Sequence, residues 1–289
     1  MYLYCGNKSR LNIVNINDMN SLRNNNLSPS RINVSGFNFL LVIIVTILGL
    51  YITYPIFGLI YLIEPSNLLN SLIRIELFDS LLLSLTTSTI STLVIAIFGI
   101  PLAYVLARYK SKIKFILQII VIFPLVLPPL VSGTLLLGVF GPYSDLGRLI
   151  PIEFTQSIIG IIIAQTYVAS PFLILPVQAA FEAVPEKYEI VARTLGKKRG
   201  YIFVKVLIPL AKKGIIIGLL MSWIRSIGEL GATMMMSYNP HTISIQIFED
   251  SAIGGIRNSV AGIVLVILIA VVVLTIFILI RKQPVRFGW

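Results

Sequence analysis

Six segments of the chain consist almost entirely of apolar residues, separated by short polar stretches. A transmembrane helix needs about 20 mostly apolar residues, and each segment is long enough. The pattern therefore predicts an all-α integral membrane protein with six transmembrane helices. The predicted spans run from about Phe39 to Ile63, Leu81 to Ala107, Phe115 to Phe140, Ser157 to Phe181, Val206 to Met236 and Val260 to Ile280.

The composition agrees with a membrane location. Of the 289 residues, 56% are hydrophobic and 12% are charged, and the mean hydropathy is +0.92. A soluble domain carries about 25% charged residues, so the chain is expected in a lipid bilayer. The net charge of +11 does not indicate a nucleic-acid partner, because the basic residues gather in segments that alternate with acidic ones.

The placement of the charges predicts the topology, because Lys and Arg concentrate in cytoplasmic loops. Basic residues cluster in the N-terminal tail, after the second span, after the fourth span and at the C-terminus. Both termini are therefore expected in the cytoplasm of a multi-pass protein of the cell membrane. The other loops carry seven acids: Glu64, Glu76, Asp79, Asp145, Glu153, Glu249 and Asp250.

The domain organisation follows from these segments. Residues 1–38 are rich in Asn and Ser and are expected to form a disordered cytoplasmic tail. Residues 39–63 are expected to form the first transmembrane helix, and residues 80–281 a core of five transmembrane helices.

The chain has one cysteine, Cys5, and one histidine, His241, so no disulfide framework or His/Cys metal cluster is expected. No metal or cofactor is expected in this chain.

A charged segment at about 182–199 separates the fourth and fifth spans. Within it, Tyr188, Val191, Ala192 and Leu195 recur at helical spacing and predict an amphipathic helix from about Pro185 to Leu195. Gly196 follows at the position where a helix ends. Such a helix on the basic side of a membrane is expected to dock a soluble partner, or else to lie on the membrane surface.

This segment resembles the cytoplasmic loop of binding-protein-dependent ABC importer permeases. The family pattern is Glu-Ala-Ala, three residues, Gly, nine residues, then Ile-x-Leu-Pro; here Gly196 is followed after nine residues by Val-Leu-Ile-Pro, ending at Pro209. The family's Glu falls on Ile190, so the chain departs from the pattern there. The resemblance implies a type I importer permease fold and an ATPase-coupling loop containing Glu189, Val191, Ala192, Arg193, Thr194, Leu195, Gly196 and Pro209.

ATP hydrolysis needs a phosphate loop of the form GxxxxGK[ST]. The nearest string, VARTLGKK, lacks the first Gly and the final hydroxyl residue. The resemblance then implies that ATP and Mg bind to a separate ATPase, and that this chain is a transport subunit and not an enzyme. It also implies two permease copies forming a homodimer, two cytoplasmic ATP-binding subunits and an extracytoplasmic solute-binding protein.

Two ionisable residues, Arg225 and Glu229, fall inside the predicted fifth span. Charged groups at membrane depth usually face a bundle interior or an aqueous path, and a spacing of four allows them to pair on one helix face. They either line the solute path or fix helix packing. Pro128 and Pro129 predict a break in the third span. The candidate path residues are Pro128, Pro129, Ser132, Arg225, Glu229 and Thr233.

The run RSIGELGAT from Arg225 to Thr233 resembles permeases for tetrahedral oxyanions, and the Pro-Pro segment resembles the molybdate/tungstate subgroup. Import of molybdate or tungstate is the favoured interpretation. Sulfate or thiosulfate is the alternative within the family. A secondary transporter is disfavoured because no matched halves are visible, and a membrane-embedded enzyme because clustered acids and histidines are missing.

Overall fold

The computed structural model describes residues 36–63, 68, 71–109 and 112–282, and every element assigned there is a helix. Contacts divide the chain into two units, Met1–Ile60 and Tyr61–Trp289. The described residues of the first unit belong to helix α2 (Gly36–Leu62), which continues two residues past the unit boundary, and its apolar side chains from residue 39 to residue 57 are exposed. The predicted disordered tail lies outside the described residues up to position 35.

Four unbroken helices of the described chain are long and apolar enough to cross a membrane. They are α2, α4 (Ile75–Arg108), α8 (Ile158–Ala183) and α14 (Ile256–Lys282). Helices α5 (Lys112–Val126) and α6 (Pro129–Phe140) bend by 115° at their junction and would make a fifth span together. The break predicted at Pro128 and Pro129 is therefore confirmed.

The predicted fifth span is not one continuous helix. It comprises a π-helical turn, η1 (Phe203–Leu207), then α11 (Ile208–Ile227) and α12 (Gly231–Met236), with an interruption at residues 228–230. Apolar residues continue on both sides of this interruption, so the hydrophobic pattern did not reveal it, and Glu229 was interpreted as a charge within a continuous helix. The count of six spans stays a prediction.

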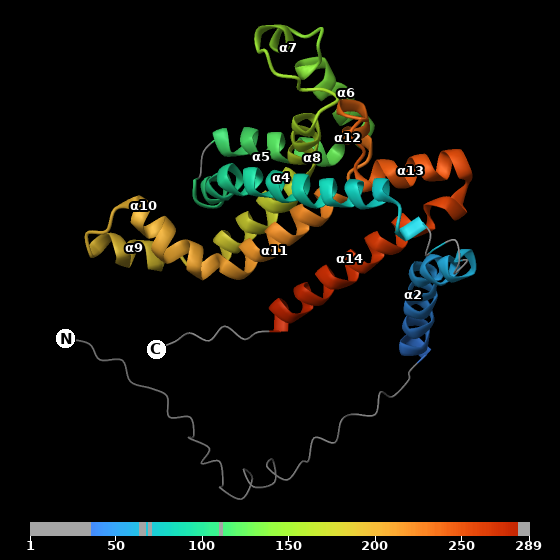
Figure 1. The fold of residues 1–289 in the computed structure, drawn as a ribbon. Helices are drawn as coiled ribbons and strands as arrows, with labels where there is room; N and C mark the ends of the chain where they lie inside the picture. The colour runs from blue at the N-terminus through green and yellow to red at the C-terminus, as the bar shows by residue number, and fades with distance from the viewer. Residues whose placement is uncertain (1–35, 64–67, 69–70, 110–111, 283–289) are drawn as a thin grey trace, which may run out of the picture. The chain divides into compact units, whose positions relative to one another are not determined.

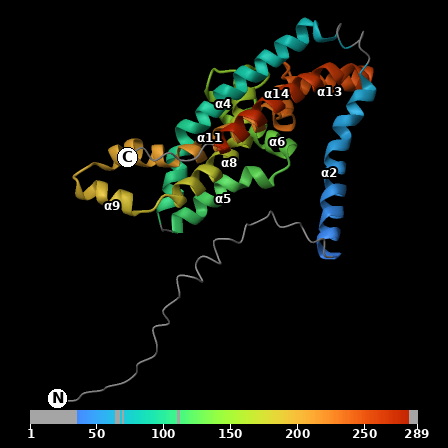
Figure 2. The ribbon, with the colours of Figure 1, turned by 90° about the horizontal axis from the view of Figure 1, so that it is seen from below.

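Helix α8 packs against both α4 and α11 and contributes more buried hydrophobic residues than any other described helix (Figures 1 and 2). Small residues allow this close packing: a Cβ on Gly214 would lie 2.2 Å from the Cβ of Ala180, and one on Gly218 would lie 3.0 Å from the carbonyl oxygen of Leu173. Small residues at helix contacts let backbones approach closely in bilayers. Helices α8 and α11 are therefore held together along their lengths.

The buried face of α4 carries a row of hydroxyl groups. Ser80 and Thr87 donate to carbonyls of their own helix, three and four residues back. Two others bond to neighbouring helices: Ser84 accepts from the backbone N–H of Ile243 in α13 (Ile243–Gly254) at 2.7 Å, and Ser91 donates to Gln165 of α8 at 3.1 Å. Helix α4 is thus tied to α8 along its length and to α13 near its start.

The breaks in two predicted spans touch one another. A Cβ on Gly231, the first residue of α12, would lie 2.8 Å from the Cβ of Pro129, the first residue of α6. One turn further, a Cβ on Gly133 would lie 2.7 Å from the Cα of Ala232. Irregular backbone at membrane depth is tolerated where protein covers it, and here each break partly covers the other.

The contact between α6 and α12 predicts a specific sensitivity to one methyl group. Gly133→Ala should lower the free energy of unfolding by about 1–3 kcal/mol, because the new Cβ meets backbone atoms that cannot move aside. Thermal unfolding of the detergent-solubilised protein measures this change. Gly138→Ala is the matched control on the same helix, because no atom lies within 4 Å of its Cβ position. Equal melting of the two variants would contradict this packing.

Candidate functional site

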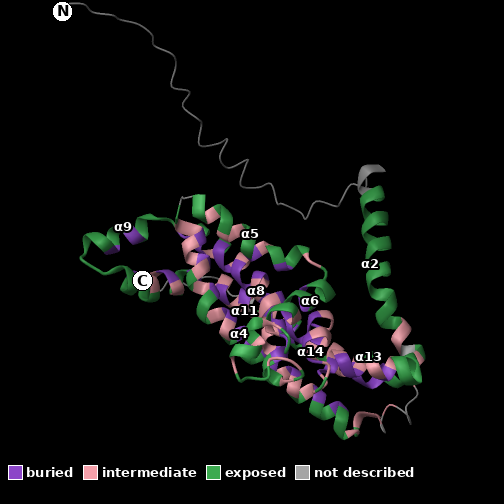
Figure 3. Cartoon of the chain, turned by 90° about the horizontal axis from the view of Figure 1, so that it is seen from above, coloured by how far each residue is buried: buried purple, intermediate pink, exposed green. Residues whose placement is uncertain are grey.

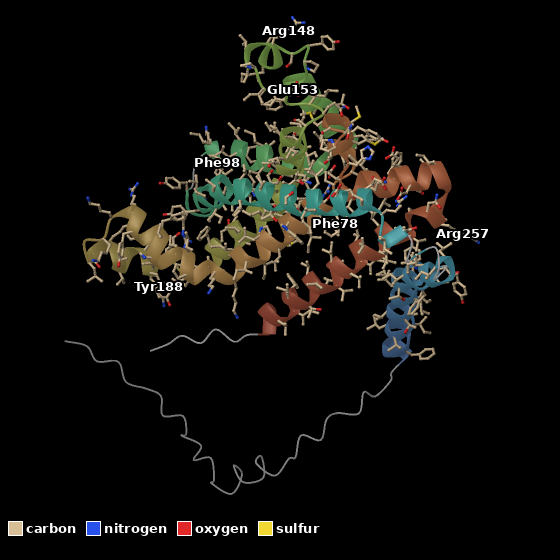
Figure 4. All side chains as sticks on the ribbon, in the orientation of Figure 1. Phe78, Phe98, Arg148, Glu153, Tyr188 and Arg257 are labelled. Atoms are coloured by element: carbon tan, nitrogen blue, oxygen red, sulfur yellow. The ribbon has the colours of Figure 1, made fainter. Side chains whose placement is uncertain are left out.

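Helix α9 (Lys187–Thr194) and the short α10 (Arg199–Ile202) form a hairpin at the ends of α8 and α11 (Figures 1 and 2). Most of α9 is exposed (Figure 3). Of the predicted apolar stripe, Tyr188, Val191 and Leu195 are exposed, the last at 71%, and Ala192 is buried. Tyr188 extends away from the ribbon (Figure 4). Exposed apolar residues at i, i+3 and i+7 make one face of α9 a surface suited to a protein partner.

The buried face of α9 is unusual because it holds a carboxylate. Glu189 is 5% exposed, and its Oε1 lies 2.6 Å from Nε of Arg108, the last residue of α4. The hydroxyl of Tyr104 donates to the other oxygen at 3.3 Å, and Arg193 lies 3.5 Å from it. Ile190, where the family pattern has its acid, is exposed. The acid of this loop therefore points inward.

The turn after α9 places Gly196 in a backbone conformation that favours glycine. Its φ is +74°, a left-handed conformation that costs other residues free energy. The N–H of Gly196 donates to the carbonyl of Arg193 at 2.9 Å, and that of Lys197 donates to Ala192 at 3.1 Å. This bonding pattern is a Schellman motif. The predicted helix end at Gly196 is confirmed.

Pro209 lies in the first turn of α11, directly after the π-helical turn. A proline has no N–H, and an N-terminal turn tolerates that loss. The N–H of Ile208 donates to the carbonyl of Phe203, five residues back. A π-helical turn often marks a functional site, and here it connects the hairpin to α11.

A polar cavity of about 280 Å³ opens between α4 and the hairpin. Its lining contains guanidinium groups, phenols and carboxylates, and among them Glu189 of α9 bonds to Arg108 and Tyr104 of α4. The lining residues are Tyr104, Arg108, Tyr109, Glu186, Glu189, Ile190, Arg193 and Arg199.

Arg225 and Glu229 pair as predicted, with Nη1 and Oε2 2.5 Å apart. The expectation that both lie on one helix is wrong, because α11 ends at Ile227 and Glu229 lies in the interruption. Its other oxygen accepts the N–H of Ala232 at 2.8 Å and so caps α12. Glu229 is 1% exposed, whereas a quarter of the Arg225 side chain is exposed and its guanidinium lies over the ring of Phe172.

The other candidate path residues lie around the two touching breaks. Pro128 and Pro129 are exposed at the bend between α5 and α6. Ser132 and Thr233 are fully buried, on the faces of α6 and α12 near the contact of Gly133 with Ala232. Their hydroxyls have no hydrogen-bond partner among the described residues. The structure thus brings the two breaks together, with Glu229 beside them.

Sequence reasoning did not identify Arg108 or Tyr104 as site residues. Both lie near the end of a long apolar span, where a basic residue is typical of topology alone. Their partner Glu189 lies more than 80 positions away, so no local pattern signals the contact. Among the described residues, no group of three or more His, Cys, Asp or Glu side chains could hold a metal ion.

Comparisons with known proteins give a consistent result. Residues 99–283 match the family described as "Binding-protein-dependent transport system inner membrane component". The chain is 41% identical over 202 residues to a probable molybdenum ABC transporter permease protein of Haloferax volcanii, covering 70% of this chain and 75% of that one. It is 36% identical over 217 residues to a molybdate/tungstate transport system permease protein of Thermococcus kodakarensis, covering 74% and 83%.

The fold also matches solved structures. A chain in the crystal structure of a bacterial alginate ABC transporter, in complex with an alginate pentasaccharide-bound periplasmic protein, has a TM-score of 0.70. The match covers 88% of this chain and 96% of that chain at 15% identity. At this identity the likeness concerns the fold alone.

The Schellman turn predicts how the hairpin responds to substitution. Gly196→Ala should destabilise the end of α9 by about 1–2 kcal/mol, because an L-residue is strained at positive φ. Hydrogen exchange at the amides of Gly196 and Lys197 should become faster. Gly200→Ala is the control, because Gly200 lies in α10 without a positive φ and also has open space at its Cβ position. Unchanged exchange in the Gly196 variant would show that the turn does not depend on glycine.

Proposed function

Since the chain belongs to the family of inner membrane components of binding-protein-dependent transport systems, we propose that it is the permease subunit of an ATP-driven molybdate or tungstate importer. It is a multi-pass inner membrane protein. Relatives of 41% and 36% identity are named for molybdenum and for molybdate/tungstate transport, and this observation carries the proposed solute. In this proposal, residues 1–38 form a cytoplasmic tail and residues 80–281 the permease core.

The ATPase subunit docks on the exposed face of α9. Three observations support this role: the apolar side chains of Tyr188, Val191 and Leu195 are exposed, the helix projects with α10 as a hairpin, and Gly196 fixes its end. ATP and Mg bind to the ATPase, and this chain contributes no cofactor site. The coupling segment includes Glu189, Ala192, Arg193, Thr194 and Pro209, of which Glu189 acts from the inward face.

A second copy of the chain covers the bend between α5 and α6. Pro128 and Pro129 are exposed there, together with Leu130 and Val131. Irregular backbone does not face lipid within the hydrocarbon region, so protein or an aqueous path must lie against it. Two copies related by a two-fold axis would place both bends along one central path. An extracytoplasmic binding protein delivers the anion to that path.

Arg225 contributes the positive charge of the path. Its side chain is partly exposed beside Met221 and Ile224, which are also exposed. A guanidinium at membrane depth faces an aqueous path or another protein and not lipid. Glu229 balances this charge, so the path does not bind an anion tightly and a divalent oxyanion can leave it. Ser132 and Thr233 supply buried hydroxyls nearby.

The proposed function is tested by reconstitution. The permease, purified with the ATPase subunits that accompany it, is placed in proteoliposomes with a solute-binding protein from the same organism. We expect ATP-dependent uptake of tungstate and molybdate, with sulfate a poor competitor. Uptake without ATP would indicate a secondary transporter, and preferential uptake of sulfate or thiosulfate would overturn the proposed solute.

The role of Arg225 is separable from packing by a double substitution. Arg225→Gln leaves Glu229 as an uncompensated buried carboxylate and should cost about 3–5 kcal/mol of stability. Adding Glu229→Gln removes that charge and should restore the melting temperature. We expect uptake in proteoliposomes to stay low in the double variant, because the anion contact is gone. Recovery of uptake together with stability would mean that the pair serves packing alone.

A further inference from the structure

Arg108 joins the end of α4 to two parts of the coupling segment. Its Nε lies 2.6 Å from Oε1 of Glu189 in α9, and its Nη2 donates to the carbonyl of Val184 at 2.7 Å, where α8 ends. The side chains of Arg108 and Glu189 are 10% and 7% exposed. A buried guanidinium that makes two bonds in a fixed geometry holds its partners in register.

The same contact includes the aromatic core beneath the hairpin. Tyr104, one turn before Arg108, donates to Glu189 at 3.3 Å. Its ring centroid lies 5.8 Å from that of Phe181 in α8 and 5.1 Å from that of Phe203 in η1. The carboxylate of Glu189 is therefore fixed against a packed junction of three helices. A displacement of α9 would have to move α4 or break these bonds.

Helix α4 extends from this junction to α13. Figures 1 and 2 show α9 and α13 near its opposite ends. Near its start, Ser84 accepts the N–H of Ile243, and Arg74, the residue before α4, forms an ion pair with Asp250 of α13. One continuous helix thus connects the α9 hairpin with the elements around α13.

We propose that Arg108 is a positioning residue that makes α9 and α4 move as one body. Glu189 is its internal partner and does not contact the ATPase. The inference rests on the proposed function, because it assigns α4 as the route by which the movement of the docked helix reaches α13. If the movement of α9 were transmitted through α8 alone, α4 would not take part in it.

The test compares variants in the reconstituted complex with ATPase subunits and binding protein. Arg108→Gln removes both bonds. Arg108→Lys keeps the charge, but its single ammonium group cannot donate to both Glu189 and the Val184 carbonyl with the planar geometry of a guanidinium. The matched control is Lys114→Gln, because Lys114 of α5 pairs at 3.9 Å with Glu182 near the end of α8, and both side chains are partly exposed. Such an exposed pair contributes little.

The measured quantity is the amount of tungstate moved per ATP hydrolysed, at equal content of copurified ATPase. We expect this ratio to fall about tenfold in Arg108→Gln, which is the size of a typical coupling between two sites of a protein. Arg108→Lys should fall between Arg108→Gln and the wild type, and Lys114→Gln should match the wild type. A different result, the absence of ATP-dependent uptake by the wild-type complex, would contradict the proposed function itself.

Two results would overturn the inference while leaving the proposed function intact. One is an unchanged ratio in both Arg108 variants. The other concerns Arg108→Lys: less ATPase copurifies, uptake falls in the same proportion, and the amount of tungstate moved per ATP is unchanged. Arg108 would then support the docking surface and not the transfer of movement.

Discussion

The structure depends on one constraint, that backbone polar groups inside a bilayer must find partners within the protein. Two segments interrupt their helices, at Leu127–Pro128 and at residues 228–230. The chain meets the constraint by placing Gly231 against Pro129 and by capping α12 with the carboxylate of Glu229. Because a carboxylate at that depth needs a counterion, Arg225 follows from the same constraint. The breaks, the cap and the ion pair form one arrangement.

The second buried ion pair follows a similar logic at the α9 end. Arg108 and Glu189 are both removed from solvent, and each has further donors or acceptors: the Val184 carbonyl for one, Tyr104 for the other. Buried pairs are tolerable when such additional bonds satisfy the remaining groups. The aromatic rings of Phe181 and Phe203 exclude water from one side. The outer face of α9 stays free for the ATPase proposed to bind there.

Sequence patterns predicted the features that are local. Long apolar runs located α4, α8 and α14 to within six residues at each end, adjacent prolines marked the bend before α6, and Gly196 marked the end of α9. The interruption at residues 228–230 was missed because apolar residues flank it on both sides, and Glu229 was interpreted as one charge within a continuous span. The Arg108–Glu189 pair was missed because it joins distant segments. Pairing depends on tertiary packing, which a hydrophobic profile does not contain.

The two roles of Glu229 have a kinetic consequence. One carboxylate oxygen caps α12 and the other faces Arg225, so the carboxylate cannot follow the guanidinium without leaving the Ala232 N–H unbonded. In the proposed path, an anion that drew Arg225 toward itself would leave behind a buried negative charge whose energy rises with the separation. That rising energy would return the arginine to Glu229. The residence time of an anion at this position would accordingly be set by the protein's own carboxylate, and short occupancy would favour throughput over retention.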